Sequence, residues 1–157
     1  MDKERPIDTF QETTILTVGI PKEVYKKKKE IKEKSFQTLL DKLSLDSNIQ
    51  LFAITALIGK YIVKKREKTG PIEGFFRYKE NEEKDEMYIL KALAVHEVDN
   101  IYILKDQEAM CKIWEEYAYA GFLEIYEWYK DNNITLETKL VDSILKALEE
   151  KKKEENN

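Results

Sequence analysis

The chain has 157 residues, of which 42% are hydrophobic and 37% are charged, and its formal net charge is −4. A chain of this length can bury roughly 68–70% of its unfolded surface, so the composition excludes wholesale disorder and predicts one folded unit with a densely charged surface. Cys111 is the only cysteine, which excludes an intramolecular disulfide, and the N-terminal residues lack the pattern of a secretory signal, so we expect a cytoplasmic protein.

Basic and acidic residues are unevenly distributed along the chain. Residues 1–70 contain 15 Lys and Arg against 10 Asp and Glu, a balance of +5, whereas residues 71–157 contain 12 against 21, a balance of −9. This polarity predicts either a basic end that faces nucleic acid or a complementary charge contact with a partner. A third alternative is that the charges only keep the helices solvated.

The N-terminal third predicts one strand and two helices. Residues 1–13 lack helical periodicity, so we expect a flexible arm there. Apolar residues alternate over residues 14–20, TILTVGI, which favours a short strand. Pro21 then predicts the start of a highly charged helix, and Ser35 can cap a second, shorter helix.

The middle of the chain contains its most apolar segment. Residues 49–63 are apolar nearly all round, which predicts the central helix of the core. The segment is shorter than the roughly 20 residues that span a bilayer, so we expect no membrane anchor. A proline and two glycines in residues 69–74 predict a turn, and a short strand could follow over residues 75–78.

Further helical segments follow in the C-terminal half. Residues 87–95 predict a helix, residues 100–105 are too short to assign, and residues 107–130 predict a long helix that contains Gly121. A glycine inside a helix costs on the order of 1 kcal/mol against alanine, so we expect another helix to approach closely there. Thr135 predicts the cap of a last helix. The expected buried face of this helix consists of Leu140, Val141, Ile144, Leu145 and Leu148.

Together these segments predict the fold class. We expect a mainly α protein, a compact bundle of about five to six helices with at most a short N-terminal strand and a short middle strand. Residues 14–150 should form a single helical domain, followed by a disordered tail over residues 151–157.

The sequence contains no pattern that predicts catalysis, a metal site or a cofactor. His96 is the only histidine, and a single histidine with a single cysteine cannot complete a tetrahedral zinc site. Glu115 and Glu116 are adjacent on the long helix, so they should face different sides and form no catalytic dyad. We expect His96 and Cys111 to be structural residues and the protein not to be an enzyme.

The long helix is unusually rich in aromatic residues, more than a single core stripe can hide. Aromatic side chains are enriched in interface cores, so this acidic, aromatic helix over residues 107–130 could contact a protein partner or a second copy. The alternative is that the rings pack internally against residues 49–63 and 135–149. The candidate partner-binding residues are Trp114, Tyr117, Tyr119, Tyr126 and Trp128.

Half of the chain resembles a known family. The resemblance is carried by QLFAITALIGKYIVKKRE before a GPIEGF turn, then by MYILKALAVHEVDNIYIL, and then by WEEYAYAGFLEIYE. These segments resemble the small proteins associated with DNA-phosphorothioation (Dnd) systems, although Tyr119 and Ala120 stand where that family would have a more polar residue and a glycine. The resemblance implies an accessory role in DNA modification and antiviral defence, without a defined reaction.

The N-terminal region resembles a second family. The stretch TILTVGIPKEVYKKKKEIKEKSFQTLL has a strand, a proline, a basic helix and a second helix, and this order is similar to that of ribbon-helix-helix proteins. In that family, strands from two copies enter the DNA major groove. The resemblance implies that one side of the strand would face the bases. The residues on that side are Thr13, Ile15, Thr17 and Gly19.

Both resemblances favour nucleic acid, and the basic tract supplies the charge that phosphate binding needs. The candidate nucleic-acid-binding residues are Thr17, Lys22, Lys26, Lys27, Lys28, Lys29, Lys64, Lys65 and Arg66. Alternatively, the tract could dock on an acidic protein. Lys64, Lys65 and Arg66 could also be present simply because cations stabilise the C-terminus of a helix. The leading hypothesis is a non-enzymatic accessory protein that binds DNA or a partner through this basic region. The rival hypothesis is an interaction subunit that uses the aromatic helix.

Overall fold

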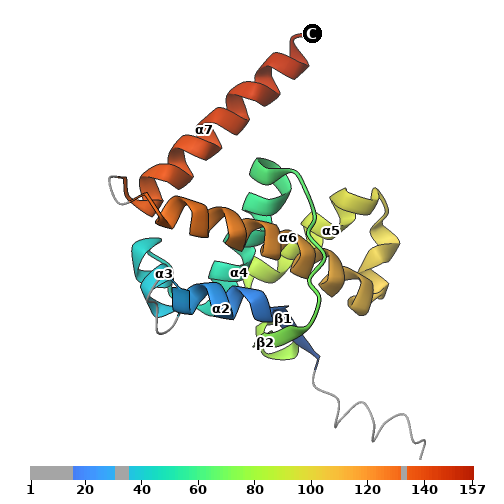
Figure 1. Cartoon of the computed structure of the whole chain (residues 1–157). Coiled ribbons are helices and arrows are strands. Elements are labelled where there is room, and N and C mark those ends of the chain that lie inside the picture. Colours follow the sequence, from blue (N-terminus) through green and yellow to red (C-terminus); the bar gives the residue numbers. More distant parts are fainter. Residues whose placement is uncertain (1–15, 31–35, 132–133) are drawn as a thin grey trace, which may run out of the picture.

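The described part of the chain is mainly α-helical. The computed structural model describes residues 16–30, 36–131 and 134–157. Within these ranges the chain forms six α-helices and one two-stranded sheet (Figure 1). The prediction of a mainly α protein with two short strands is therefore confirmed. None of the helices in these ranges is long and apolar enough to cross a membrane.

The two strands pair with each other. Strand β1 (Thr17–Pro21) runs antiparallel to β2 (Ile72–Arg77), with an irregularity in the register between Val18 and Gly19. Both strands lie close to the segments where alternation and turn residues predicted them. One side of β1 contributes Val18 and Ile20 to the hydrophobic core.

Two short helices follow β1. Helix α2 (Lys22–Glu30) begins directly after Pro21, as the fixed φ of proline favours, and Glu23 lies in its first turn. Helix α3 (Gln37–Lys42) contributes Leu39 and Leu40 to the core. The cap predicted at Ser35 lies outside the described residues.

The apolar middle segment forms the core helix that the sequence predicts. The Ser47 side chain accepts a hydrogen bond from the backbone N–H of Gln50 at the start of α4 (Asn48–Leu57). The helix then continues as a π-helical segment, η1 (Ile58–Val63), which ends at Lys64 in the left-handed conformation. Most of α4 is buried, because it is covered by α6, α5 and β2.

The next elements cover one side of this core. A short 3₁₀ turn, η2 (Lys79–Asn81), leads into α5 (Asp85–Val98), which buries Met87, Leu90 and Leu93. The segment over residues 100–105 that the sequence left unassigned is a 3₁₀ helix, η3 (Ile101–Lys105).

Helix α6 (Gln107–Tyr129) is the centre of the fold. The Asp106 side chain caps it by accepting a hydrogen bond from the Ala109 N–H. The helix contacts α2, α4, α5, α7, β1, η1 and η3. At Gly121 the backbone of α4 passes so close that a Cβ atom would overlap the carbonyl oxygen of Thr55, which confirms the predicted close approach.

Helix α7 (Leu136–Glu155) departs from the body of the protein. Thr135 caps it by accepting a hydrogen bond from the Thr138 N–H. Its first turns meet the body, and the remainder extends past it toward the C-terminus (Figure 1). The helix continues to Glu155, so the disordered tail predicted over residues 151–157 is wrong for most of its length. The charged residues there satisfy their backbone groups within the helix instead of fraying.

Candidate functional site

The main candidate for a functional surface is the apolar face of α7. Helix formation here is locally encoded, because Thr135 caps the N-terminus and Glu137 and Lys152 lie at the ends that their charges favour. Apolar residues recur at spacings of three and four, which places them on one side of the helix. The helix therefore presents an apolar stripe whether or not the body covers it.

The body leaves most of this stripe uncovered. The exposed fractions are 54% for Val141, 44% for Ile144, 54% for Leu145 and 52% for Leu148. Leu136, in the first turn, is buried, and it is the only buried side chain of the helix. The prediction that this face is buried within the chain is thus wrong. The physical reason is that α7 is fixed to the body mainly by its first turn, and its later turns run beside η1 across an open groove, with Lys64 paired to Glu150 at 3.4 Å.

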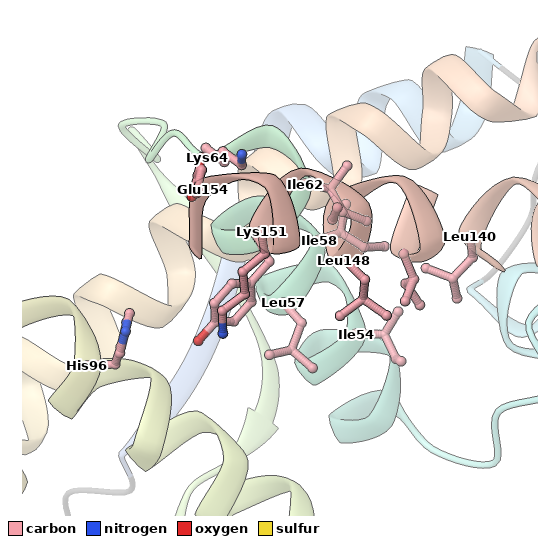
Figure 2. A pocket seen from close by; sticks show the side chains of 13 residues that line it. Ile54, Leu57, Ile58, Ile62, Lys64, His96, Leu140, Leu148, Lys151 and Glu154 are labelled. Carbon is pink, nitrogen blue, oxygen red and sulfur yellow. The ribbon is translucent and has the colours of Figure 1, made fainter. Parts of the chain in front are cut away.

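An apolar groove lies between α7 and the core helix formed by α4 and η1. Its volume is about 510 Å³. Figure 2 shows Leu140 and Leu148 of α7 lining the same groove as Ile54 and Leu57 of α4, with Lys64 and Glu154 at one end of the groove. The other lining residues are Ile58, Tyr61, Ile62, His96, Ile144, Ala147 and Lys151. The groove could therefore accept an apolar surface of helical shape, with charged residues at its mouth.

A polar cluster fixes η1 to the neighbouring helices beside this groove. Lys60 of η1 donates to Glu97 of α5 at 2.8 Å, and the Tyr117 hydroxyl of α6 donates to the same carboxylate at 2.6 Å. Burial would raise the pKa of Glu97, but the hydrogen bonds from Lys60 and Tyr117 outweigh it and lower that pKa. Arg66 lies 3.6 Å from Glu97 and donates to Glu116 at 3.0 Å. The charges of this cluster compensate one another and hold η1 against α5 and α6.

Glu115 has a different environment from its neighbour Glu116. It is buried, and its carboxylate accepts the backbone N–H of Gly19 in β1 at 2.8 Å. Burial raises the pKa of Glu115 to about 7, and the charge of Glu116 adds to the shift, although the hydrogen bond from Gly19 opposes it. The two carboxylates point to different elements, β1 and Arg66. The prediction that they face different sides is confirmed, and they do not form an acid–base pair.

Most aromatic residues of α6 pack inside the protein, which is one of the two alternatives that the sequence left open. The side chains of Trp114, Tyr117, Tyr126 and Trp128 are buried, and only Tyr119 is partly exposed. The other alternative, a partner contact through these rings, is wrong for the four buried ones, because α6 is surrounded by other elements on several sides and not along a single stripe. The polar atoms of the rings are satisfied internally: the Trp114 Nε1 donates to the Leu90 carbonyl at 2.6 Å, for example.

The candidate nucleic-acid-binding residues fall on separate elements. Thr17 of β1 and Lys22 and Lys26 of α2 are exposed, and Lys26 pairs with Glu23 at 3.1 Å. The side chains of Lys27, Lys28 and Lys29 lie outside the described part of the chain.

The second group follows η1 and faces carboxylates of the same chain. Lys64 pairs with Glu150 at 3.4 Å and Lys65 pairs with Glu67 at 3.1 Å, both at exposed positions where such pairs are weak. Arg66 is held by the partly buried polar cluster. Lys64 and Lys65 thus remain accessible to a phosphate, whereas Arg66 is engaged.

Strand β1 is arranged differently from what the ribbon-helix-helix resemblance implies. Its hydrogen-bonded neighbour is β2 of the same chain, and the Glu115 carboxylate accepts a hydrogen bond from the Gly19 N–H. Gly19, implied to face DNA, is buried, whereas Thr17 is exposed. Thr13 and Ile15 lie outside the described residues.

Two reactive residue types occur once each. Cys111 is buried, and burial together with the Glu115 charge raises the pKa of its thiol to about 12, so the thiolate is strongly disfavoured. His96 is exposed on α5, with its ring 6.2 Å from that of Tyr61. In residues 16–30, 36–131 and 134–157, no cluster of three or more His, Cys, Asp or Glu side chains is arranged to hold a metal ion.

Comparison with known proteins leaves the site to be interpreted from its own geometry. No protein-family model, curated protein or solved structure matches the chain. The sequence pattern identified the apolar stripe of α7 but predicted neither its exposure nor the groove. One signal was available: α7 is nearly as long as α6, yet its apolar residues end at Leu148.

Proposed function

We propose that the protein is a non-enzymatic subunit that joins a larger assembly through the apolar face of α7 and the adjoining groove. The observation that carries this proposal is the exposure of four large apolar side chains on one side of a helix that extends from the body. Contiguous exposed apolar surface is unusual in monomeric proteins and marks interaction sites. This proposal replaces the aromatic residues of α6 with α7 as the contact surface.

The size of the surface decides what kind of partner it needs. Burying a whole leucine or isoleucine side chain contributes about 1.5–3 kcal/mol, so covering the exposed halves of Val141, Ile144, Leu145 and Leu148 gives roughly 1 kcal/mol each. Micromolar affinity requires about 8 kcal/mol. The partner must therefore also reach the groove residues Ile54 and Leu57, which an amphipathic helix can do.

The biological setting is also a proposal. The Dnd-associated resemblance supports an accessory role in DNA modification and antiviral defence, and an interaction subunit fits such a role without requiring a reaction of its own. The partner would then be a component of that defence complex.

We expect Leu145→Glu to disrupt the native assembly. Leu145 is exposed and does not line the groove, so the substitution should leave folding intact while placing a charge in the contact. In extracts of cells that express the protein at its natural level, the wild type should migrate as a complex larger than one chain, and the variant should migrate as a single chain.

The matched control is Lys146→Glu, which introduces the same side chain one position along, outside the apolar stripe. It should leave the complex intact, and circular dichroism melts of both variants should match that of the wild type. Migration of the wild type as a single chain would contradict the proposal, as would an unchanged complex in Leu145→Glu.

The basic N-terminal region supports a second candidate contact, with DNA. Lys22 and Lys26 are exposed, and phosphate binding requires accessible cations of this kind; the exposed hydroxyl of Thr17 lies on the adjoining strand. We expect the purified protein to bind labelled duplex DNA with an affinity that falls as salt rises, with a log–log slope of about 0.9 for each phosphate neutralised.

Reversing the charges of residues 26–29 should abolish this binding, whereas Lys64→Glu combined with Lys65→Glu tests the second basic group separately. Binding that is unchanged in the first variant would remove the tract from the contact. Absence of binding even at low salt would leave the assembly through α7 as the remaining function.

A further inference from the structure

The apolar stripe of α7 is wider than the groove beside it. Leu140, Ile144 and Leu148 line the groove, whereas Val141 and Leu145 belong to the stripe but do not line it. A small apolar ligand in the groove would leave Val141 and Leu145 as exposed as they are now. A second helix lying along α7 would cover both parts of the stripe, so the geometry favours a helical occupant.

Two pairs of positions in α7 are complementary when the helix is reversed about Ile144. Counting outward from Ile144, Leu140 has Leu148 at the same distance on the other side, and Glu137 has Lys151. In an antiparallel pair centred on Ile144, leucine would therefore face leucine and each glutamate would face a lysine. A parallel pair would place Glu137 against Glu137 and Lys151 against Lys151, which is unfavourable.

The position of α7 in the fold also suits an antiparallel pair. The first turn of α7 is buried in the body through Leu136, its middle turns run beside η1 with Glu150 paired to Lys64, and its C-terminal end extends past the body (Figure 1). Antiparallel pairing would place the two bodies at opposite ends of the helix pair. The contact would then be isologous, as in most homodimers, with each residue's environment repeated about the two-fold axis.

We infer that the occupant of this surface is α7 of a second copy of the chain, packed antiparallel and centred on Ile144. The inference deepens the proposed function and rests on it, because it names the partner of the same surface. The dimer buries the apolar stripe, and the pairs of Glu137 with Lys151 of the other copy set its direction.

The first test is sedimentation of the chain purified alone. We expect a reversible monomer–dimer equilibrium in the micromolar range for the wild type and for Lys146→Glu, and monomers for Leu145→Glu. A wild type that stays monomeric at concentrations on the order of 100 µM, where contacts worth about 5.5 kcal/mol would already be visible, would overturn the inference.

The second test uses single cysteines to read the direction of packing. Cys111 is buried, and the series is made in a Cys111→Ala background so that every disulfide reports on α7. On oxidation, Ile144→Cys should form a dimeric disulfide. Leu140→Cys and Leu148→Cys should each cross-link poorly alone but efficiently when the two proteins are mixed, because these positions face each other only in the antiparallel pair.

The outcomes separate this inference from the proposed function. Efficient self-cross-linking of Leu140→Cys and of Leu148→Cys would indicate parallel packing and overturn the antiparallel arrangement. If the purified chain is monomeric while Leu145→Glu still disrupts the native complex, the surface binds a different protein. The inference of a second copy is then wrong, and the proposed function stands. If neither assay shows assembly, both the proposed function and the inferred dimer are wrong.

Discussion

Replacing Gly121 with alanine is expected to lower the free energy of unfolding by on the order of 3 kcal/mol, at the upper end of the usual cost of overpacking a core. Gly121 of α6 meets the backbone of α4, and Gly59 of η1 meets the backbone of α6. A Cβ at Gly121 would overlap the Thr55 carbonyl oxygen, and a Cβ at Gly59 would overlap the Tyr117 carbonyl oxygen. Because the obstacle is backbone in both cases, no side-chain rotation can relieve it.

Urea unfolding followed by circular dichroism measures this loss. Gly70→Ala is the matched control: its φ is +59°, but a Cβ there meets nothing within 4 Å, so it should cost only the roughly 1–2 kcal/mol of a left-handed backbone. Gly59→Ala should cost about as much as Gly121→Ala. The double variant should cost less than their sum, since one separation of the helices relieves both overlaps. A loss at Gly121 no larger than at Gly70 would contradict the packing described.

Replacing Glu115 with glutamine is expected to remove a pH dependence of stability. The folded-state pKa of Glu115 is raised to about 7, mainly by burial, above its ordinary value of 4.5. A raised carboxyl pKa means that the folded state binds the proton more tightly, so the stabilising contribution is fully present below pH 4.5 and is lost as pH rises to about 7. The shift corresponds to on the order of 3 kcal/mol.

The effect of Glu115 is isolated by measuring the free energy of unfolding of Glu115→Gln and of the wild type across pH and taking the difference. Glutamine can still accept the Gly19 N–H through its amide oxygen, so the variant should gain stability over the wild type as pH is raised from about 5 to about 8. Glu108→Gln, an exposed change on the same helix, should retain the wild-type slope. Parallel stability curves for Glu115→Gln and the wild type would show that this carboxyl does not titrate in the predicted range.

The polar cluster and the buried glutamate together define how the core helix is held. The π-helical segment η1 places Lys60 against Glu97 and Tyr117, while Glu115 joins α6 to β1. Irregular helical turns of this type often occur at functional sites. Here η1 also lines the groove beneath α7, so the same segment that is pinned to α5 and α6 shapes the proposed docking surface.

The sequence by itself determined the elements whose causes are local. Pro21 and Thr135 each precede a helix that begins where capping and backbone preference predict it, and residues 49–63 contribute to the core because they are apolar nearly all round. The close approach at Gly121 was also predictable, since a glycine inside a long helix has few other reasons to be there.

Only the tertiary structure decided which amphipathic or aromatic face is covered. The aromatic residues of α6 and the leucines of α7 give equally clear sequence patterns, yet Trp114 is buried and Leu145 is half exposed. Periodicity shows that a helix has an apolar side, but whether that side meets the same chain depends on where the helix leaves the body. That direction depends on contacts between residues far apart in sequence, which a local pattern does not encode.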